Sequence, residues 1–361
     1  MQLRIPGPTP CPPEVLQAMS KQMINHRGKE FEDILNSITP GLQQVFQTKG
    51  DVLTLTTSGT GGLEAAIVNT LSPGDKVLAA SIGVFGDRFV DIAKQFGVTV
   101  KYLGFEWGKA ADPQAIHNAL EADPQIKAVL ITHNETSTGV TNNLKEIAPI
   151  VKGLEKLLIV DAVSSLGCID LPVDVLRCDV VVTASQKGWM VPPGLAMVSM
   201  SDEAWKAHAQ ASIPRYYMDF TKAKDFLVKR GGQTPWTPVV SVCYALDVAL
   251  GLMLHEGLTN IFNRHARIAQ MTRDGIKSLG LSLFADENYA SNTVTAVKAD
   301  KKFNAAKLVQ VLRDEYGITI AGGQGKLKGE IIRIAHLGWV TDKDIEAVLQ
   351  ALAKALPRSL A

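Results

Sequence analysis

Short apolar runs alternate with amphipathic stretches along the chain from Asp51 onward. The first segments predict the order strand, helix, strand, helix, strand, in DVLTLTT, GLEAAIVNTL, KVLAAS, FGDRFVDIAKQFG and VTVKYLGF. The rhythm continues through IKAVLITH (126–133), LKEIAPIVKGLE, KLLIVDAV (156–163), CDVVVTAS (178–185) and AMVSMS (196–201). These later strands are apolar throughout, which is typical of parallel sheets covered by helices on both faces. The pattern therefore predicts an α/β fold with a mostly parallel sheet.

The pattern changes after about Asp219. Two long helical stretches (239–256 and 258–279) lead to TVTAVKA, NAAKLVQVLRDEYG, EIIRIAH and a terminal helix near 341–356. This mixture predicts a smaller α+β domain at the C-terminal end. We expect an N-terminal segment over 1–20, a large domain over 21–240 and a small domain over 241–361.

Composition and charge narrow the functional class. Of 361 residues, 46% are hydrophobic and 20% charged, as expected for a chain that buries a core. The net charge is +1 and the charged residues are scattered along the chain. This argues against nucleic acid or an acidic membrane surface as the partner and favours a small molecule. No signal-peptide pattern and no run of about 18 apolar residues occurs, so we expect a protein that is neither secreted nor membrane-spanning.

The cysteines indicate a reducing compartment. They are widely spaced, form no C-x-x-C pair and have no histidine at metal-ligand spacing: Cys11, Cys168, Cys178 and Cys243. We expect free thiols, a cytoplasmic location and no metal site.

Ligands of open α/β sheets bind beyond the carboxyl ends of the strands, where the first candidate, SGTGG (58–62), closes DVLTLTT. Its glycines allow close backbone approach, Ser58 and Thr60 offer hydroxyls, and the following helix offers free N–H groups, which together suit a phosphate. A tight structural turn would explain the same glycines. The segment is neither a P-loop nor a full dinucleotide fingerprint, because no G-K-[ST] follows and Glu64 stands at the third glycine's place.

Three further strand ends carry polar groups. HNETSTG (133–139) follows one strand, Asp161 ends the next, and Lys187 follows CDVVVTAS within TASQKGWMVPPG. Helix capping would explain the first two, His133 alone is best read as structural, and an isolated lysine is normally solvated. A lysine screened from water by aromatic and proline neighbours could instead act as an amine nucleophile.

The combination suits pyridoxal phosphate. That cofactor needs an anion site for its phosphate, a lysine that binds it covalently, and a carboxylate that keeps its pyridine nitrogen protonated. The strand ends offer one candidate for each need.

The ordered segments SGTGGLEAA, GVFGDR, HNETSTGV, IVDAVSSLG, TASQKG and IIRIAHLG resemble the class V aminotransferases of fold type I. Within that family the chain is similar to the alanine–glyoxylate and serine–glyoxylate (or serine–pyruvate) branch, over nearly its whole length. The resemblance implies that Lys187 carries the cofactor, with Gln186 near the phosphate. It implies that Asp161 pairs with the pyridine nitrogen and that Val163 packs on one face of the ring.

The resemblance assigns the remaining contacts. Phe85 stacks on the other ring face, Thr136 reaches the phenolic oxygen, and Arg333 in IIRIAHLG holds the substrate carboxylate. The phosphate turn supplies Thr60, Gly61 and Gly62. Relatives also send a tyrosine and a threonine from the partner subunit of a homodimer with shared active sites. Here the corresponding stretch, GGQTPWTPVV (231–240), has no tyrosine, and its candidates are Thr234 and Thr237.

The implied reaction is a ping-pong transamination between a small amino acid, alanine or serine, and a small 2-oxo acid, glyoxylate or pyruvate. One alternative is another activity of the same cofactor, as a lyase or a desulfurase. A desulfurase would need a mobile catalytic cysteine, and none of the four lies in a recognisable glycine-rich loop. The other alternative is a non-catalytic accessory subunit, because some relatives carry the label of a soluble hydrogenase small subunit. This chain has no cysteine set for an iron–sulfur or nickel site.

Overall fold

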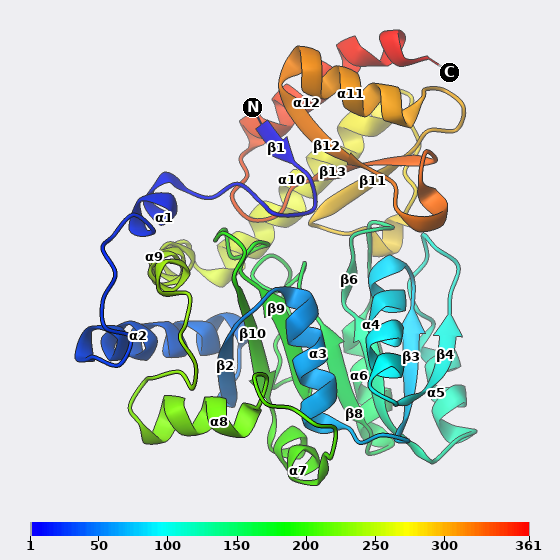
Figure 1. Ribbon diagram of the computed structural model, residues 1–361. Helices are drawn as coiled ribbons and strands as arrows, with labels where there is room; N and C mark the ends of the chain where they lie inside the picture. Colours follow the sequence, from blue (N-terminus) through cyan, green and yellow to red (C-terminus); the bar gives the residue numbers. More distant parts are fainter. Residues whose placement is uncertain (1, 361) are drawn as a thin grey trace.

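A seven-stranded sheet forms the centre of the larger part of the molecule, and a four-stranded sheet forms the centre of the smaller part (Figure 1). The computed structural model describes residues 2–360. The strands are β1 (Gln2–Arg4), β2 (Asp51–Thr56), β3 (Lys76–Ser81), β4 (Thr99–Gly104), β5 (Ile126–Thr132), β6 (Asn134–Glu135), β7 (Val140–Thr141), β8 (Leu157–Asp161), β9 (Val180–Ala184), β10 (Leu195–Met200), β11 (Val294–Lys298), β12 (Ile318–Gly322) and β13 (Ile331–Ala335). The helices are α1 (Pro13–Ala18), α2 (Lys29–Phe46), α3 (Gly59–Thr70), α4 (Val84–Gln95), α5 (Pro113–Glu121), α6 (Leu144–Gly153), α7 (Asp202–Gln210), α8 (Phe220–Lys224), α9 (Val240–Glu256), α10 (Leu258–Ser278), α11 (Ala305–Tyr316) and α12 (Asp342–Ala355).

The large sheet has the strand order β2-β10-β9-β8-β5-β3-β4. The strands from β9 to β4 are parallel, as the apolar runs predict, whereas β10 is antiparallel to both β2 and β9. The predicted strand AMVSMS is therefore present and buried, but it does not continue the parallel series. The reason is its connection: residues 185–194 contain no crossover helix, and a parallel neighbour would need a crossover of about a dozen residues or more.

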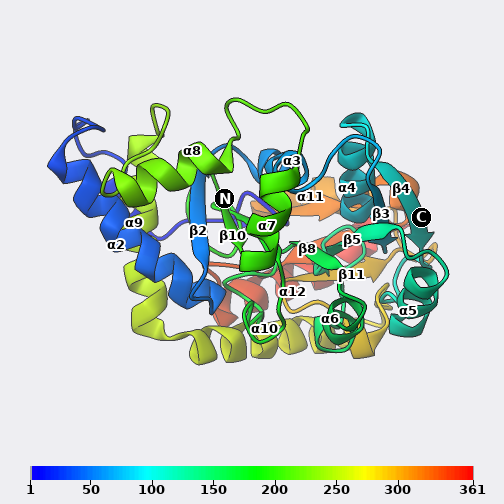
Figure 2. The ribbon, with the colours of Figure 1, turned by 90° about the horizontal axis from the view of Figure 1, so that it is seen from below.

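Helices cover both faces of this sheet, and Figure 2 shows the strands between the two layers. Alternate residues of β3 enter different cores, with Leu78 and Ala80 on one face and Val77 and Ala79 on the other. The first core includes apolar residues of α2, α5, α6 and α9, and the second those of α3, α4 and α7. Burial on both faces explains why these strands are apolar throughout.

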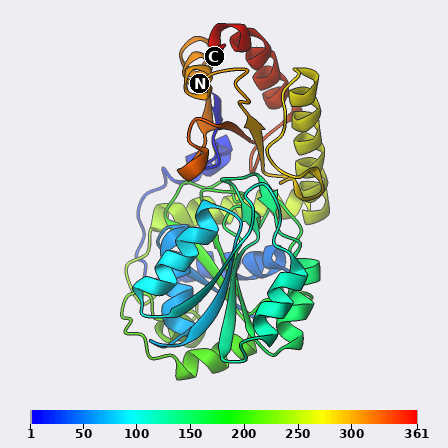
Figure 3. The same ribbon diagram turned by 90° about the vertical axis from the view of Figure 1, so that its right-hand side faces the viewer.

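The smaller part has the sheet order β1-β12-β13-β11 and a core shared with α10, α11 and α12. It stands over one end of the large part (Figure 3). Strand β1 pairs in parallel with β12, so the N-terminal residues lie in the same sheet as the C-terminal strands. Helix α9 packs against α1 and α2. The domain limits at residues 20 and 240 stay predictions.

Two helices bear on membrane insertion. Within residues 2–360, no single helix is long and apolar enough to cross a membrane. The pair α9 and α10, bent by 85°, meets the criteria of length and composition only when the two helices are joined.

Candidate active site

Polar side chains gather in one cavity at the carboxyl ends of the parallel strands, as predicted for ligand sites of open sheets. The turns after β2, β8 and β9, together with the segment after β5 and the start of α4, contribute its lining: Ser58, Gly59, Thr60, Leu63, Phe85, Arg88, Asn134, Thr136, Asp161, Val163, Ser164, Gln186 and Lys187. The structure therefore brings the candidates from four separate strand ends together.

The SGTGG turn places the start of α3 against the sheet. A Cβ atom on Gly59 would lie 2.8 Å from Val163 Cγ2, and one on Gly62 would lie 2.7 Å from Val182 Cγ1. Glycine is required for this close approach, which brings the free N–H groups of the first helical turn to the cavity. Thr60 lines the cavity, whereas Gly61 and Gly62, which follow it in the first turn of α3, are not among the lining residues.

Lys187 lines the cavity from the connection between β9 and β10. Its Nζ donates a hydrogen bond of 2.5 Å to the carbonyl of Pro6, and Thr9 Oγ1 donates one of 2.9 Å to the Lys187 carbonyl. Burial lowers the pKa of the Lys187 amine to about 8, against the opposing effect of the Asp161 carboxylate. Near pH 8 a large fraction of the amine is therefore neutral, as a nucleophile or base requires.

The aromatic neighbour of Lys187 anchors this connection. Trp189 is fully buried, and its Nε1 donates a hydrogen bond of 2.9 Å to Thr183 Oγ1 on β9. The apolar surroundings noted in the sequence thus hold the lysine-bearing turn against the sheet.

Asp161 ends β8 and is buried. Its carboxylate accepts hydrogen bonds from the Val163 backbone N–H at 2.9 Å and from Thr132 Oγ1 at 3.4 Å. Burial raises the pKa of Asp161 to about 6, and the two hydrogen bonds, together with the charges of Lys187 and Arg88, only partly oppose this shift. A cationic partner in the cavity would stabilise the ionised form.

Glu135 fixes the start of α4. Its carboxylate accepts hydrogen bonds from the backbone N–H groups of Phe85 and Gly86, at 3.0 and 3.1 Å, and from the backbone and hydroxyl of Ser137. This arrangement aims the first turn of α4, and with it Phe85 and Arg88, into the cavity. Burial raises the pKa of Glu135 to about 6.

Arg333 reaches the large part from the middle of β13. Its Nη1 donates to the Thr136 carbonyl at 3.0 Å and to Gln324 Oε1 at 3.3 Å, and its Nε donates to the Gly322 carbonyl at 2.9 Å. Burial lowers the pKa of this guanidinium to about 10, and no carboxylate of residues 2–360 forms an ion pair with it. Arg333 does not itself line the cavity described above but borders it through Thr136.

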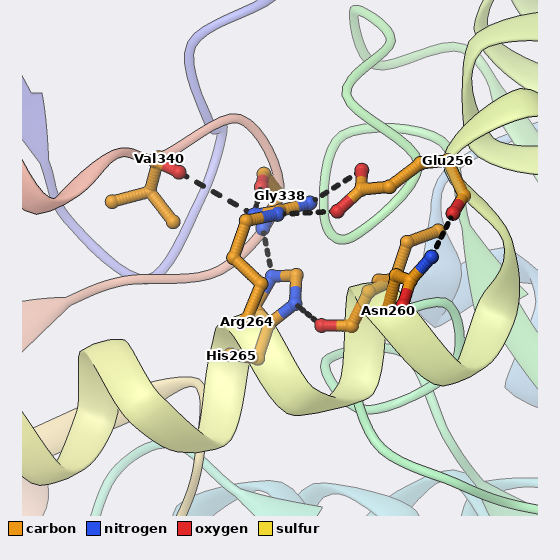
Figure 4. Close-up of polar contacts among 7 residues, drawn as sticks. Glu256, Asn260, Arg264, His265, Gly338 and Val340 are labelled. Carbon is orange, nitrogen blue, oxygen red and sulfur yellow. Dashed lines mark hydrogen bonds and ion pairs between the residues drawn. The ribbon is translucent and has the colours of Figure 1, made fainter.

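The loop that follows β13 is clamped to the helical elbow between α9 and α10 (Figure 4). Arg264 pairs with Glu256 through two contacts of 2.6 and 3.0 Å and donates to the Gly338 carbonyl at 3.2 Å, while the Gly338 N–H donates to His265 Nε2 at 3.1 Å. A Cβ atom on Gly338, where φ is +75°, would lie 3.1 Å from the Lys187 carbonyl. The clamp therefore holds the loop that follows the strand of Arg333 close to the backbone of Lys187.

Other predicted residues lie elsewhere. His133 is buried but faces a separate cavity, beside Asn142 and Asp170. Thr234 and Thr237 do not line the cavity of their own chain. Four residues of the site were not predicted from the sequence, although they lie in the motifs that predicted it: Arg88, Asn134, Ser164 and Glu135. The signal for Arg88 was available, because it follows Phe85 by three residues on a helix and so shares its face.

The cavity fits pyridoxal phosphate on grounds visible in the structure. Within residues 2–360, Gln186 Oε1 is buried without a hydrogen-bond partner and Asp161 is a buried carboxylate without an ion pair. Gly59, whose Cβ would lie 2.8 Å from Val163 Cγ2, allows the first turn of α3 to pack closely beside the cavity. If the cofactor occupies this cavity, six residues of its lining would hold it: Thr60, Gln186, Asp161, Val163, Phe85 and Lys187. When bound, pyridoxal phosphate supplies an electron sink that stabilises negative charge at the α-carbon of a substrate.

Known proteins similar to this chain carry several names. A protein of Anabaena cylindrica named soluble hydrogenase 42 kDa subunit is 45% identical over 98% of this chain and 92% of its own length. The L-aspartate–glyoxylate aminotransferase of Paracoccus denitrificans is 38% identical over 94% of this chain and 86% of its own. The serine–glyoxylate aminotransferase of Methylorubrum extorquens is 36% identical over 93% and 86%.

The fold is shared with solved structures. The crystal structure of an alanine–glyoxylate aminotransferase from Nostoc sp. matches with a TM-score of 0.94 and 29% identity, over 98% of this chain and 94% of that one. The predicted fold type I architecture, with a large domain and a smaller α+β domain, is confirmed. The family model for class V aminotransferases matches residues 2–335. The chain therefore belongs to the class V aminotransferases, a family of pyridoxal-phosphate-dependent enzymes, as the sequence motifs predicted.

Proposed function

We propose that the protein transfers the amino group of a small amino acid to a small 2-oxo acid in a ping-pong cycle, with Lys187 as the catalytic lysine. The observation that carries this assignment is the meeting of Lys187, Asp161 and Gln186 in one cavity at the carboxyl edge of the sheet. Lys187 Nζ binds the cofactor and, once displaced by substrate, moves the proton at the α-carbon. Asp161 stabilises a cationic ring nitrogen, Val163 and Phe85 enclose the ring, and Thr136 meets the phenolic oxygen.

Arg333 binds the α-carboxylate of both the donor and the acceptor. Its planar fork suits a carboxylate, and it makes no ion pair within the described residues, so its buried charge favours an arriving anion. The donor is alanine or serine and the acceptor glyoxylate or pyruvate, which the names of the serine–glyoxylate and alanine–glyoxylate relatives support. The aspartate–glyoxylate relative makes an acidic donor the specific competitor.

Spectroscopic half-reactions test this substrate class. Alanine and serine should convert the bound cofactor to its amine form with a higher kcat/KM than aspartate or glutamate. A preference for the two acidic donors would refute the small-donor proposal. No conversion with any amino acid would refute the transaminase proposal itself.

The thiols favour transamination over desulfuration. A desulfurase needs a reactive cysteine thiolate, but burial raises the pKa of Cys168, Cys178 and Cys243 to about 12 and that of Cys11 to about 11. The other alternative is a non-catalytic accessory subunit. Some relatives are named as a hydrogenase subunit, but that name describes those proteins. The match of residues 2–335 to the class V aminotransferases supports an enzyme over a non-catalytic subunit. Because all four thiols are free, we also place the protein in the cytoplasm, a reducing compartment.

We further propose a homodimer in which the 231–240 stretch completes the partner's site. Thr234 Oγ1 already donates to the Trp236 carbonyl at 2.7 Å, whereas the Thr237 side chain is exposed and makes no hydrogen bond within residues 2–360. Thr237 is therefore the better candidate for the partner's phosphate.

Subunit mixing tests the shared site. Protomers carrying Lys187→Ala mixed with protomers carrying Thr237→Ala should recover part of the lost activity through hybrid dimers. Recovery with Thr234→Ala but not with Thr237→Ala would reverse the choice of threonine. Sedimentation as an active monomer would contradict the dimer.

A further inference from the structure

Arg88 is a cation of the cavity for which the assignments above provide no role. Its guanidinium lies over the Phe85 ring, with Cζ 4.7 Å from the ring centroid. Its one side-chain hydrogen bond runs from Nη1 to Thr60 Oγ1 at 3.5 Å, and no carboxylate of residues 2–360 forms an ion pair with it. The Arg88 charge lowers the pKa of Asp161 in the same cavity, but a partly buried guanidinium that forms no ion pair still favours binding of an anion.

The charges around the cavity are unequal. Lys187 and Arg88 line it and Arg333 borders it, whereas Asp161 is the one carboxylate in its lining. Glu135 lies behind the cavity with its oxygens occupied by four hydrogen bonds. The site must bind two anionic groups, namely the cofactor phosphate and the substrate carboxylate. Because Arg333 is assigned to the carboxylate, Arg88 is the arginine available to bind the phosphate.

The position of Arg88 beside the predicted phosphate turn also supports its assignment to the phosphate. Thr60 belongs to the first turn of α3, where the N–H groups and the helix dipole favour a phosphate. Phe85 and Arg88 are three residues apart on α4 and share a face, so a residue that covers the cofactor ring is followed by one that reaches the phosphate turn. Without Arg88, a phosphate at this turn would meet only neutral donors, such as the Thr60 hydroxyl, the Gln186 amide and backbone N–H groups.

We propose that Arg88 is the charged ligand of the cofactor phosphate, binding it with the fork of its guanidinium beside Thr60. This inference rests on the cofactor position given under the proposed function. It also explains how a cavity with a second arginine can serve small donors, since that arginine is engaged by phosphate and is not free for a distal carboxylate.

Binding of two ligands to the apoprotein tests the proposal without turnover. Pyridoxal phosphate and pyridoxal differ only in the phosphate, and both report binding by absorbance. Arg88→Gln should weaken pyridoxal phosphate on the order of 10- to 100-fold and leave pyridoxal nearly unchanged, as expected for loss of a charge-assisted hydrogen bond. The affinity of Arg88→Lys for pyridoxal phosphate should lie between those of the wild type and Arg88→Gln, because lysine keeps the charge but lacks the forked guanidinium. Lys94→Gln, an exposed lysine of the same helix, is the charge-matched control and should leave both affinities unchanged.

Each other outcome overturns the proposal. An equal loss of affinity for both ligands would indicate that Arg88 instead supports the packing of Phe85. Unchanged affinity for pyridoxal phosphate with a selective loss of the aspartate half-reaction would assign Arg88 to a distal carboxylate. If Arg88→Gln fails to fold, the ratio of the two affinities in Arg88→Lys decides, and an unchanged ratio refutes the phosphate contact. Because the readout is binding, loss of the substrate proposal would not affect this result.

Discussion

The Glu135 carboxylate accepts a 3.0 Å hydrogen bond from the backbone N–H of Phe85, the second residue of α4. A carboxylate from the segment after β5 therefore acts as the cap of a helix that begins far away in the sequence. Its negative charge also stabilises the positive end of the α4 dipole. The aim of Phe85 and Arg88 into the cavity depends on this contact.

Glu135→Ala should destabilise the protein, because several buried N–H groups lose their acceptor. The expected loss in the free energy of unfolding is about 1–3 kcal/mol, accompanied by weaker cofactor binding. Glu135→Gln keeps one acceptor oxygen and should lose less on both measures. Urea denaturation and cofactor titration of the two variants check this, and equal behaviour of Gln and Ala would contradict the capping role.

Asp161→Asn should have opposite effects on the apoprotein and the enzyme. Because burial raises the Asp161 pKa from 3.8 to about 6, the folded state retains a proton that the unfolded state releases, and stability falls as pH rises between these values. The neutral amide avoids this cost, so the apoprotein should gain up to about 3 kcal/mol at pH 7. Turnover should fall on the order of a hundredfold or more, since the ring nitrogen loses its counter-charge.

Thermal unfolding of the apoprotein across pH 4 to 7 measures the first effect, and steady-state kinetics the second. An Asp161→Asn apoprotein less stable than the wild type at pH 7 would contradict the account of burial. Near-normal turnover would reduce Asp161 to a structural residue of the turn after β8.

The Lys187 amine of the apoprotein should titrate near pH 8, well below an exposed lysine. Since the Asp161 charge raises this pKa, Asp161→Asn should lower it further. Rates of acylation by acetic anhydride, followed at Lys187 by mass spectrometry over pH 6 to 11, measure the value, with exposed Lys94 as the internal reference. A Lys187 profile that coincides with that of Lys94 would show that burial does not tune the amine.

Arg333→Lys should keep the visible spectrum of the bound cofactor and raise the KM of both the donor and the oxo acid. The lysine places a point charge where a fork is needed and cannot reproduce the contacts to Thr136 and Gly322 together. Arg267→Lys, an exposed arginine paired with Asp342, is the matched control. An unchanged KM for alanine would refute the role given to Arg333.

Much of the site could be predicted because parallel strands bring their carboxyl ends to one edge, so Thr60, Asp161 and Lys187 converge whatever the loops do. Arg88 was not predicted because it lies within a helix, whereas the candidate residues were sought at the ends of strands. The antiparallel direction of β10 was not predicted because a strand buried on both faces has the same apolar sequence whichever way it runs. The hydrogen bond from Lys187 to the Pro6 carbonyl involves a backbone atom 181 residues away, for which no side-chain pattern exists.

The most direct test of the account is the position of the covalent bond to the cofactor. Borohydride reduction of the yellow holoenzyme, followed by peptide mass spectrometry, should place the cofactor mass on Lys187 alone. Lys187→Ala should still bind the cofactor through the phosphate turn, yet show no turnover with alanine or serine and glyoxylate or pyruvate. Label on another lysine, or appreciable transamination by Lys187→Ala, would contradict the assignment of Lys187 as the catalytic residue.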